Sequence, residues 1–85
     1  MTHRATASFW RLYEALPEEV RVLADKNFSL LKRNPRHPSL QFKKVGSELW
    51  SARIGSDYRA LALEEEACFA WIWIGPHDEY LRRIG

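Results

Sequence analysis

The sequence of 85 residues has little of several features that mark other classes of protein. Its one cysteine, Cys68, can form neither an internal disulfide nor a zinc cluster, which fits a reducing cytosol. The longest uncharged apolar run, Ala67–Pro76, has about half the length of a membrane-spanning helix. The first residues lack the apolar segment of a secretory signal. We therefore expect a cytoplasmic protein that enters no membrane.

The motifs of common enzyme classes are also missing. The sequence has no Walker loop, no glycine-rich dinucleotide motif, no metalloprotease His-Glu-x-x-His motif and no zinc-type spacing of Cys and His. It therefore predicts no metal and no cofactor. Four glycines and four prolines exclude collagen and low-complexity sequence. A chain of this length is sufficient for a single domain, residues 1–85, with a thin core.

What the sequence does contain is a basic middle segment. Residues 32–59 carry seven basic and two acidic side chains, whereas residues 1–31 are balanced and residues 60–85 are acidic. A basic segment is expected where a protein binds a polyanion, and such binding weakens as salt rises. A solvated basic face would have the same composition. Charge alone leaves both interpretations open.

Apolar spacing predicts two helices in the first half of the chain. Ser8 is the expected N-cap of a short helix that carries Phe9 and Leu16 on one face. A second helix follows Pro17 and ends before Pro35, because the residue before a proline is pushed out of the helical region. The short link between them predicts a helical hairpin.

From residue 40 onward the apolar period changes to that of strands. Residues 40–45, 48–54, 58–63 and 68–74 predict strands, with a tight hairpin loop at residues 55–57. The tail from His77 is expected to form one helical turn. The predicted fold class is α+β, an N-terminal helical hairpin packed on a three- to four-stranded antiparallel sheet. If only one face of this sheet is covered, the other carries the polar strand residues.

Two arginines flank the predicted hairpin loop. If the loop at Gly55 closes symmetrically, Arg53 lies directly across from Arg59 on the same face. Two guanidinium groups this close repel each other unless an anion lies between them, and their planar forks suit phosphate oxygens. The alternative is a pair of edge arginines that form surface ion pairs with Asp57 and Glu48, which would contribute little.

Two further side chains follow the last predicted strand. Imidazole changes its charge near neutral pH, so His77 is a natural general acid or base, although an isolated histidine is more often structural. Tyr80 could stack on a base or orient a phosphate, or simply pack in a helix. Trp50, Trp71 and Trp73 are expected mostly in the core, whereas Trp10 is a candidate for burial under a partner.

Read together, six stretches resemble the RelE/ParE superfamily of toxins from type II toxin–antitoxin modules. They lie at residues 9–20, 31–40, 42–43, 50–55, 58–61 and 71–80, and they include NPRHPSL at 34–40, SARIG at 51–55, YRAL at 58–61 and WIGPHDEY at 73–80. The resemblance runs from about residue 9 to residue 81. Within the superfamily, the sequence resembles a RelE-like subgroup of translational repressors. It implies two N-terminal helices on an antiparallel sheet, and an antitoxin partner that wraps the toxin. It also implies cleavage of mRNA, on the ribosome in many members, without a metal.

The same resemblance implies which residues form the site. Arg59 matches the arginine of the family's Tyr-Arg strand, and Arg53 matches a basic position on the preceding strand. His77 matches the position just after the glycine of the last strand, and Tyr80 matches the C-terminal tyrosine. These four are the expected catalytic residues. Three further basic residues are expected to hold the RNA backbone: Arg36, Lys43 and Lys44.

The sequence departs from the RelE pattern in two places. Ser51 and Arg53 stand where two lysines would be typical, and residues 2–7 are too short and polar to predict a long first strand. Two other interpretations therefore stay open. One is a ParE-like toxin that binds DNA gyrase and has no hydrolytic site, and the other is a catalytically inactive, partner-binding member.

Overall fold

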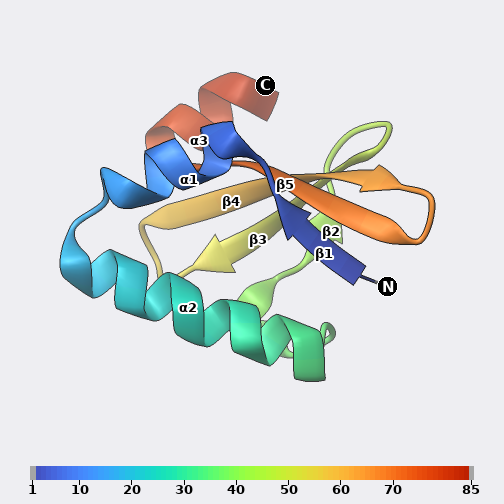
Figure 1. Cartoon of the computed structure of the whole chain (residues 1–85), viewed down its shortest axis with the longest axis horizontal. Coiled ribbons are helices and arrows are strands. Elements are labelled where there is room, and N and C mark those ends of the chain that lie inside the picture. Colours follow the sequence, from blue (N-terminus) through green and yellow to red (C-terminus); the bar gives the residue numbers. More distant parts are fainter. Residues whose placement is uncertain (1, 85) are drawn as a thin grey trace.

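The computed structural model describes residues 2–84. The elements are β1 (Thr2–Ala5), α1 (Ala7–Glu14), α2 (Glu18–Arg33), a short 3-10 helix (Pro38–Leu40), β2 (Lys43–Lys44), β3 (Leu49–Ile54), β4 (Tyr58–Glu65), β5 (Cys68–Pro76) and α3 (His77–Ile84). Figure 1 shows α2 crossing the sheet. No helix within residues 2–84 has the length and apolar character needed to cross a membrane.

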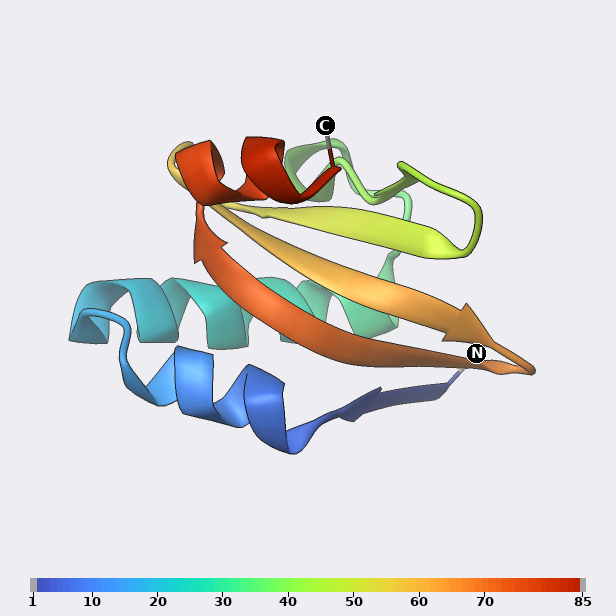
Figure 2. The same cartoon turned by 90° about the horizontal axis from the view of Figure 1, so that it is seen from above.

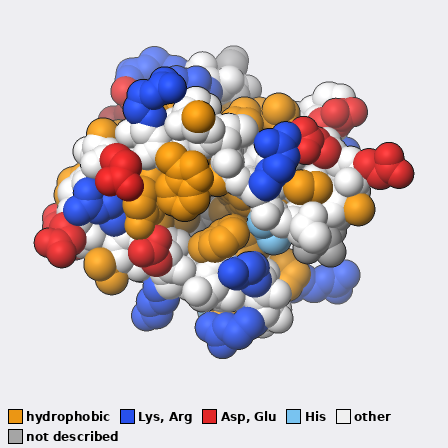
Figure 3. Space-filling model, viewed as in Figure 1, with side chains coloured by type: hydrophobic (Ala, Val, Ile, Leu, Met, Phe, Trp, Pro, Cys, Tyr) orange, Lys and Arg blue, Asp and Glu red, His pale blue; other side chains and the backbone are white. Residues whose placement is uncertain are grey.

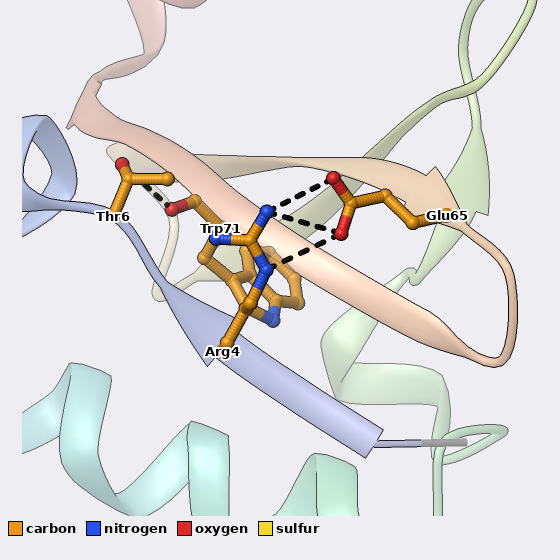
Figure 4. A network of polar contacts seen from close by, with 4 residues as sticks. All are labelled: Arg4, Thr6, Glu65 and Trp71. Carbon is orange, nitrogen blue, oxygen red and sulfur yellow. Dashed lines mark hydrogen bonds and ion pairs between the residues drawn. The ribbon is translucent and has the colours of Figure 1, made fainter.

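The sheet has five strands in the order β1-β5-β4-β3-β2. Strand β1 runs parallel to β5, and all the other pairs are antiparallel. The prediction of a three- to four-stranded antiparallel sheet was therefore wrong in strand number and in direction. The missing strand is β1, which is short, half exposed and polar because it forms an edge. Arg4 in this strand forms an ion pair with Glu65 at 2.9 Å (Figure 4).

Helices cover both faces of the sheet, as Figure 2 shows. On one face, Val20 and Leu31 of α2 pack with Ala52, Ile54 and the other buried residues of the main core. On the opposite face α3 forms a smaller core (Leu61, Trp73 and Tyr80). The expectation of a single helical turn after residue 76 was wrong, since α3 spans eight residues. The α+β class is correct, but the helices do not lie only at the N-terminal end.

A β-bulge in β5 sends two neighbouring tryptophans to opposite faces. Leu61 pairs with Trp73 and Ala62 pairs with Trp71, so Ile72 is the extra residue. Trp71 therefore packs in the main core, whereas Trp73 packs against α3, and both are nearly fully buried.

The backbone carbonyls at this bulge are satisfied by the start of α1. The Thr6 hydroxyl donates to the Trp71 carbonyl at 3.2 Å (Figure 4), and the Ser8 hydroxyl donates to the Ile72 carbonyl at 3.2 Å. Thr6, rather than the predicted Ser8, is the N-cap of α1, because its Oγ1 accepts a hydrogen bond from the Phe9 N–H. The first helix is thereby fixed to β5.

Candidate functional site

The β3–β4 hairpin places the two arginines opposite each other, as the sequence predicts. Arg53 and Arg59 are register partners, and Gly55 closes the loop with a φ of 64°. Arg53 Nε donates to the Gly55 carbonyl at 2.9 Å, and Arg59 Nη1 lies 3.4 Å from the same oxygen. Arg59 Nη1 also donates to the Tyr58 carbonyl at 2.8 Å. Both guanidinium groups are therefore held at the loop by backbone oxygens.

Neither of these arginines forms an ion pair with a carboxylate within residues 2–84. The alternative expectation, that Arg53 and Arg59 form ion pairs with Asp57 and Glu48, was therefore wrong. Burial, and then the nearby charge of Arg53, lowers the pKa of Arg59 below its ordinary value. An arginine stays protonated even so. Two half-buried positive charges that have no carboxylate partner in the protein are stabilised when an anion binds to them.

Helix α3 brings the other two predicted residues to the same end of the sheet. The backbone N–H of His77, its first residue, donates to the Asp57 carbonyl at 2.8 Å. The rings of His77 and Tyr80 are 5.8 Å apart, and the Arg59 guanidinium carbon lies 6.0 Å from the centre of the Tyr80 ring. The Tyr80 ring is thus a common neighbour of the imidazole and of Arg59.

Tyr80 is directed into the protein. Its side chain is only 5% exposed, and its hydroxyl donates to Oγ of Ser51, itself 2% exposed, at 3.2 Å. The phenol is therefore engaged in the smaller core and holds α3 to β3. Sequence reasoning missed the part that Ser51 plays. The one signal for it was a small polar residue among the apolar residues of a strand.

The three residues expected to hold the RNA backbone do not lie together. Lys43 pairs with Ser51, so it lies on the face of the sheet that carries Arg53, and it is exposed. Lys44 pairs with Trp50 on the other face, and its Nζ lies 4.0 Å from Glu64 Oε1. Arg36 lines a depression beside Trp50. Of the three, only Lys43 lies on the same face of the sheet as the arginine pair.

Within residues 2–84, no three side chains of His, Cys, Asp or Glu gather closely enough to hold a metal ion. The side chains that the structure brings together at this end of the sheet include two guanidinium groups and one imidazole. Such groups bind an anion and exchange protons with it.

The fold has clear counterparts among solved structures. The RelB–RelE antitoxin–toxin complex from Methanococcus jannaschii matches with a TM-score of 0.73 and 11% identity over 95% of this chain and 98% of that one. The toxin–antitoxin complex RelBE2 from Mycobacterium tuberculosis matches with a TM-score of 0.70 and 21% identity over 89% and 96%. A YoeB/ParE toxin from Agrobacterium tumefaciens matches with a TM-score of 0.69 and 19% identity over 91% and 99%.

These likenesses define the class of the fold. The chain has the RelE/ParE toxin fold, so the structural part of the resemblance seen in the sequence is confirmed. No protein-family model and no curated protein matches the sequence.

Proposed function

We propose that this chain is the toxin of a type II toxin–antitoxin module and cleaves mRNA in the cytoplasm without a metal ion. The observation that carries the proposal is the arginine pair. Arg53 and Arg59 face each other across the hairpin, contact one carbonyl oxygen and have no ion pair with a described carboxylate. A scissile phosphate would supply the negative charge that this pair lacks.

In the proposed reaction the 2′-oxygen of the RNA forms a bond to phosphorus, and the bond from phosphorus to the 5′-oxygen breaks. The 2′-hydroxyl gives its proton to a base, and the leaving 5′-oxygen takes one from an acid, so the products are a cyclic phosphate and a 5′-hydroxyl. Arg59 and Arg53 stabilise the doubly negative phosphorane. His77 exchanges protons with the reacting oxygens, and Tyr80 keeps Arg59 and His77 in place.

The partner in this proposal is a co-encoded antitoxin of acidic composition. Two of the similar structures are complexes of a RelE-type toxin with its antitoxin. Hydrophobic side chains of this chain gather around a hollow between α1 and α2 (Figure 3), where Trp10 is 50% and Phe28 is 39% exposed. The space there is about 80 Å³, which suits one apolar side chain of a partner better than a small-molecule ligand.

The test of the activity is a cell-free translation assay combined with primer-extension mapping of cuts in the mRNA. We expect Arg59→Ala to lower the rate of cleavage by about 10²–10³-fold with little loss of binding, since this group acts on charge that develops in the transition state. His77→Gln should lower the rate of cleavage, because glutamine cannot exchange a proton with the reacting oxygens. Arg11→Ala, which changes an exposed arginine on α1, is the matched control.

Lys43 is expected to contact the RNA backbone in the ground state and the transition state alike. Lys43→Ala should therefore weaken binding and flatten its dependence on salt, whereas the exposed Lys26→Ala on α2 should do neither. Cleavage that survives both Arg59→Ala and His77→Gln would refute the assigned site. A wild type that leaves translation intact and traps gyrase–DNA cleavage complexes would show a ParE-like toxin instead.

The test of the partner is genetic and biochemical. We expect a small reading frame for an acidic protein beside the gene, and co-expression of the two should yield a complex that no longer stops translation. Trp10→Ala should weaken the complex, because an exposed tryptophan is the kind of side chain that dominates an interface. A solitary gene without such a neighbour would contradict the assignment.

A further inference from the structure

A second depression lies at the other end of β3 from the arginine pair, and on the other face of the sheet. Trp50 points to the face that α2 covers, since it precedes Ser51, which faces α3. The depression measures about 480 Å³, within the range of about 300–1,000 Å³ that ligand sites occupy. Its main lining residues are Lys32, Arg36, Phe42, Trp50, Glu64 and Phe69.

The floor of the depression is aromatic. The ring centres of Phe42 and Trp50 are 4.9 Å apart, those of Phe42 and Phe69 5.1 Å, and those of Trp50 and Phe69 5.4 Å. Phe69 is buried, but Phe42 and Trp50 are only half-buried, so part of their rings faces solvent. Any nucleobase can stack on a surface of this kind, because every base has a π-face.

The rim of the depression is positive. Lys32 and Arg36 are both exposed, and neither forms an ion pair within residues 2–84. The one acidic lining residue, Glu64, is already engaged: its Oε1 accepts a hydrogen bond from Trp50 Nε1 at 2.8 Å and lies 4.0 Å from Lys44 Nζ. Lys32 Nζ lies 4.9 Å from the centre of the Phe28 ring, and neither Lys32 nor Arg36 has a carboxylate partner among the described residues. Two such cations beside aromatic rings favour a ligand that is flat at one end and anionic at the other.

We infer that this depression is a nucleotide-binding site, with the base on Phe42 and Trp50 and the phosphate at Lys32 and Arg36. The site is distinct from the arginine pair at Arg53 and Arg59, and it does not rest on the proposed function, because binding there requires no cleavage. A free mononucleotide and a nucleotide within a single strand offer the same chemistry, and the experiment separates the two.

The test is a titration followed by the indole N–H signals in ¹H–¹⁵N spectra. The Trp50 signal is assigned by its loss in Trp50→Phe, and the probes are 5′-AMP, adenosine, inorganic phosphate and a deoxyadenylate hexamer, which has no 2′-hydroxyl to react. We expect 5′-AMP to shift the Trp50 signal more strongly than adenosine or phosphate. Much tighter binding of the hexamer than of 5′-AMP would identify a single strand as the ligand. Equal affinity for the two would identify a free nucleotide.

Variants decide whether the rim and the floor act together. Lys32→Ala and Arg36→Ala should each weaken 5′-AMP binding severalfold and reduce its salt dependence. Arg33→Ala is the matched control, since Arg33 is an exposed neighbour of Lys32 that does not line the depression. Arg59→Ala should leave this binding unchanged even if it abolishes cleavage.

Four results would overturn the inference. They are no shift of the Trp50 signal with millimolar 5′-AMP, an equal shift with inorganic phosphate alone, an equal loss in Arg33→Ala, and tighter binding of a phosphotyrosine peptide than of either nucleotide probe. The second and third would show a basic patch without base stacking, and the last would show a protein ligand.

Discussion

Removing the hydroxyl of Tyr80 is expected to weaken the attachment of α3 to the sheet. This hydroxyl donates to Ser51 Oγ at 3.2 Å, both side chains are at most 5% exposed, and Ser51 Oγ has no other hydrogen bond within residues 2–84. A buried polar group that loses its partner costs about 1–3 kcal/mol. Tyr80→Phe should therefore lower the free energy of unfolding by about 1–2 kcal/mol and Tm by roughly 4–8 °C per kcal/mol.

A double-mutant cycle makes this prediction sharp. Ser51→Ala leaves the Tyr80 hydroxyl without a partner and should cost a similar amount. The double variant Tyr80→Phe/Ser51→Ala removes both polar groups, so it should be less destabilised than the sum of the two single variants. Urea unfolding at constant pH gives the three values. If the two single effects simply add, within about 0.5 kcal/mol, the buried hydrogen bond is not what holds α3.

The same variants separate two roles for Tyr80 in cleavage. If its ring positions Arg59 and His77, Ser51→Ala and Tyr80→Phe should lower the cleavage rate to a similar degree, because both release the same contact. If the phenol itself contacts RNA, Tyr80→Phe should lower the rate while Ser51→Ala leaves it near wild type. The second pattern would refute the positioning role.

Three further predictions concern stability and are measured by chemical unfolding. Burial lowers the pKa of His3 in the folded protein, so the unfolded chain binds more protons as the pH falls below the ordinary histidine value of about 6.5. The free energy of unfolding should therefore be full above that pH and decrease below it, and it should decrease less in His3→Gln. An equal decrease in the two proteins would contradict the lowered pKa. Leu40→Ala empties a fully buried position and should cost about 2–5 kcal/mol, whereas Val22→Ala, 62% exposed, should stay within about 0.5 kcal/mol; equal losses would contradict the burial argument. Gly55→Ala places a Cβ at a φ of 64° and 2.7 Å from the Leu23 side chain, and should cost at least about 1–2 kcal/mol, so a neutral result would show that the loop rearranges.

The parts of the fold that follow from local periodicity could be predicted from the sequence. The second helix begins after Pro17, and the hairpin register between Arg53 and Arg59 is as expected. In both cases the signal is local: a proline sets a helix boundary, and a short glycine loop sets the pairing on either side of it.

The remaining features depend on contacts between residues far apart in the chain. Strand β1 is polar and half exposed, so only its pairing with β5 makes it a strand. The bulge at Ile72 breaks the alternation from which the facing of Trp71 and Trp73 would be deduced. Burial of Tyr80 requires Ser51 as a partner from another element. Local periodicity does not specify these pairings, because each one is decided by packing.

The two adjacent lysines show how the register of a strand separates residues that the sequence places side by side. Both were expected to hold RNA, yet successive side chains of a strand point to opposite faces, so one RNA backbone at the arginine pair can reach Lys43 but not Lys44. Register then assigns each lysine to a surface: Lys43 pairs with Ser51 on the face of Arg53, and Lys44 pairs with Trp50 on the face of the aromatic depression. A nucleic acid that contacted both would have to pass around the edge strand β2. For that reason the two surfaces of this sheet are better treated as separate sites than as one basic patch.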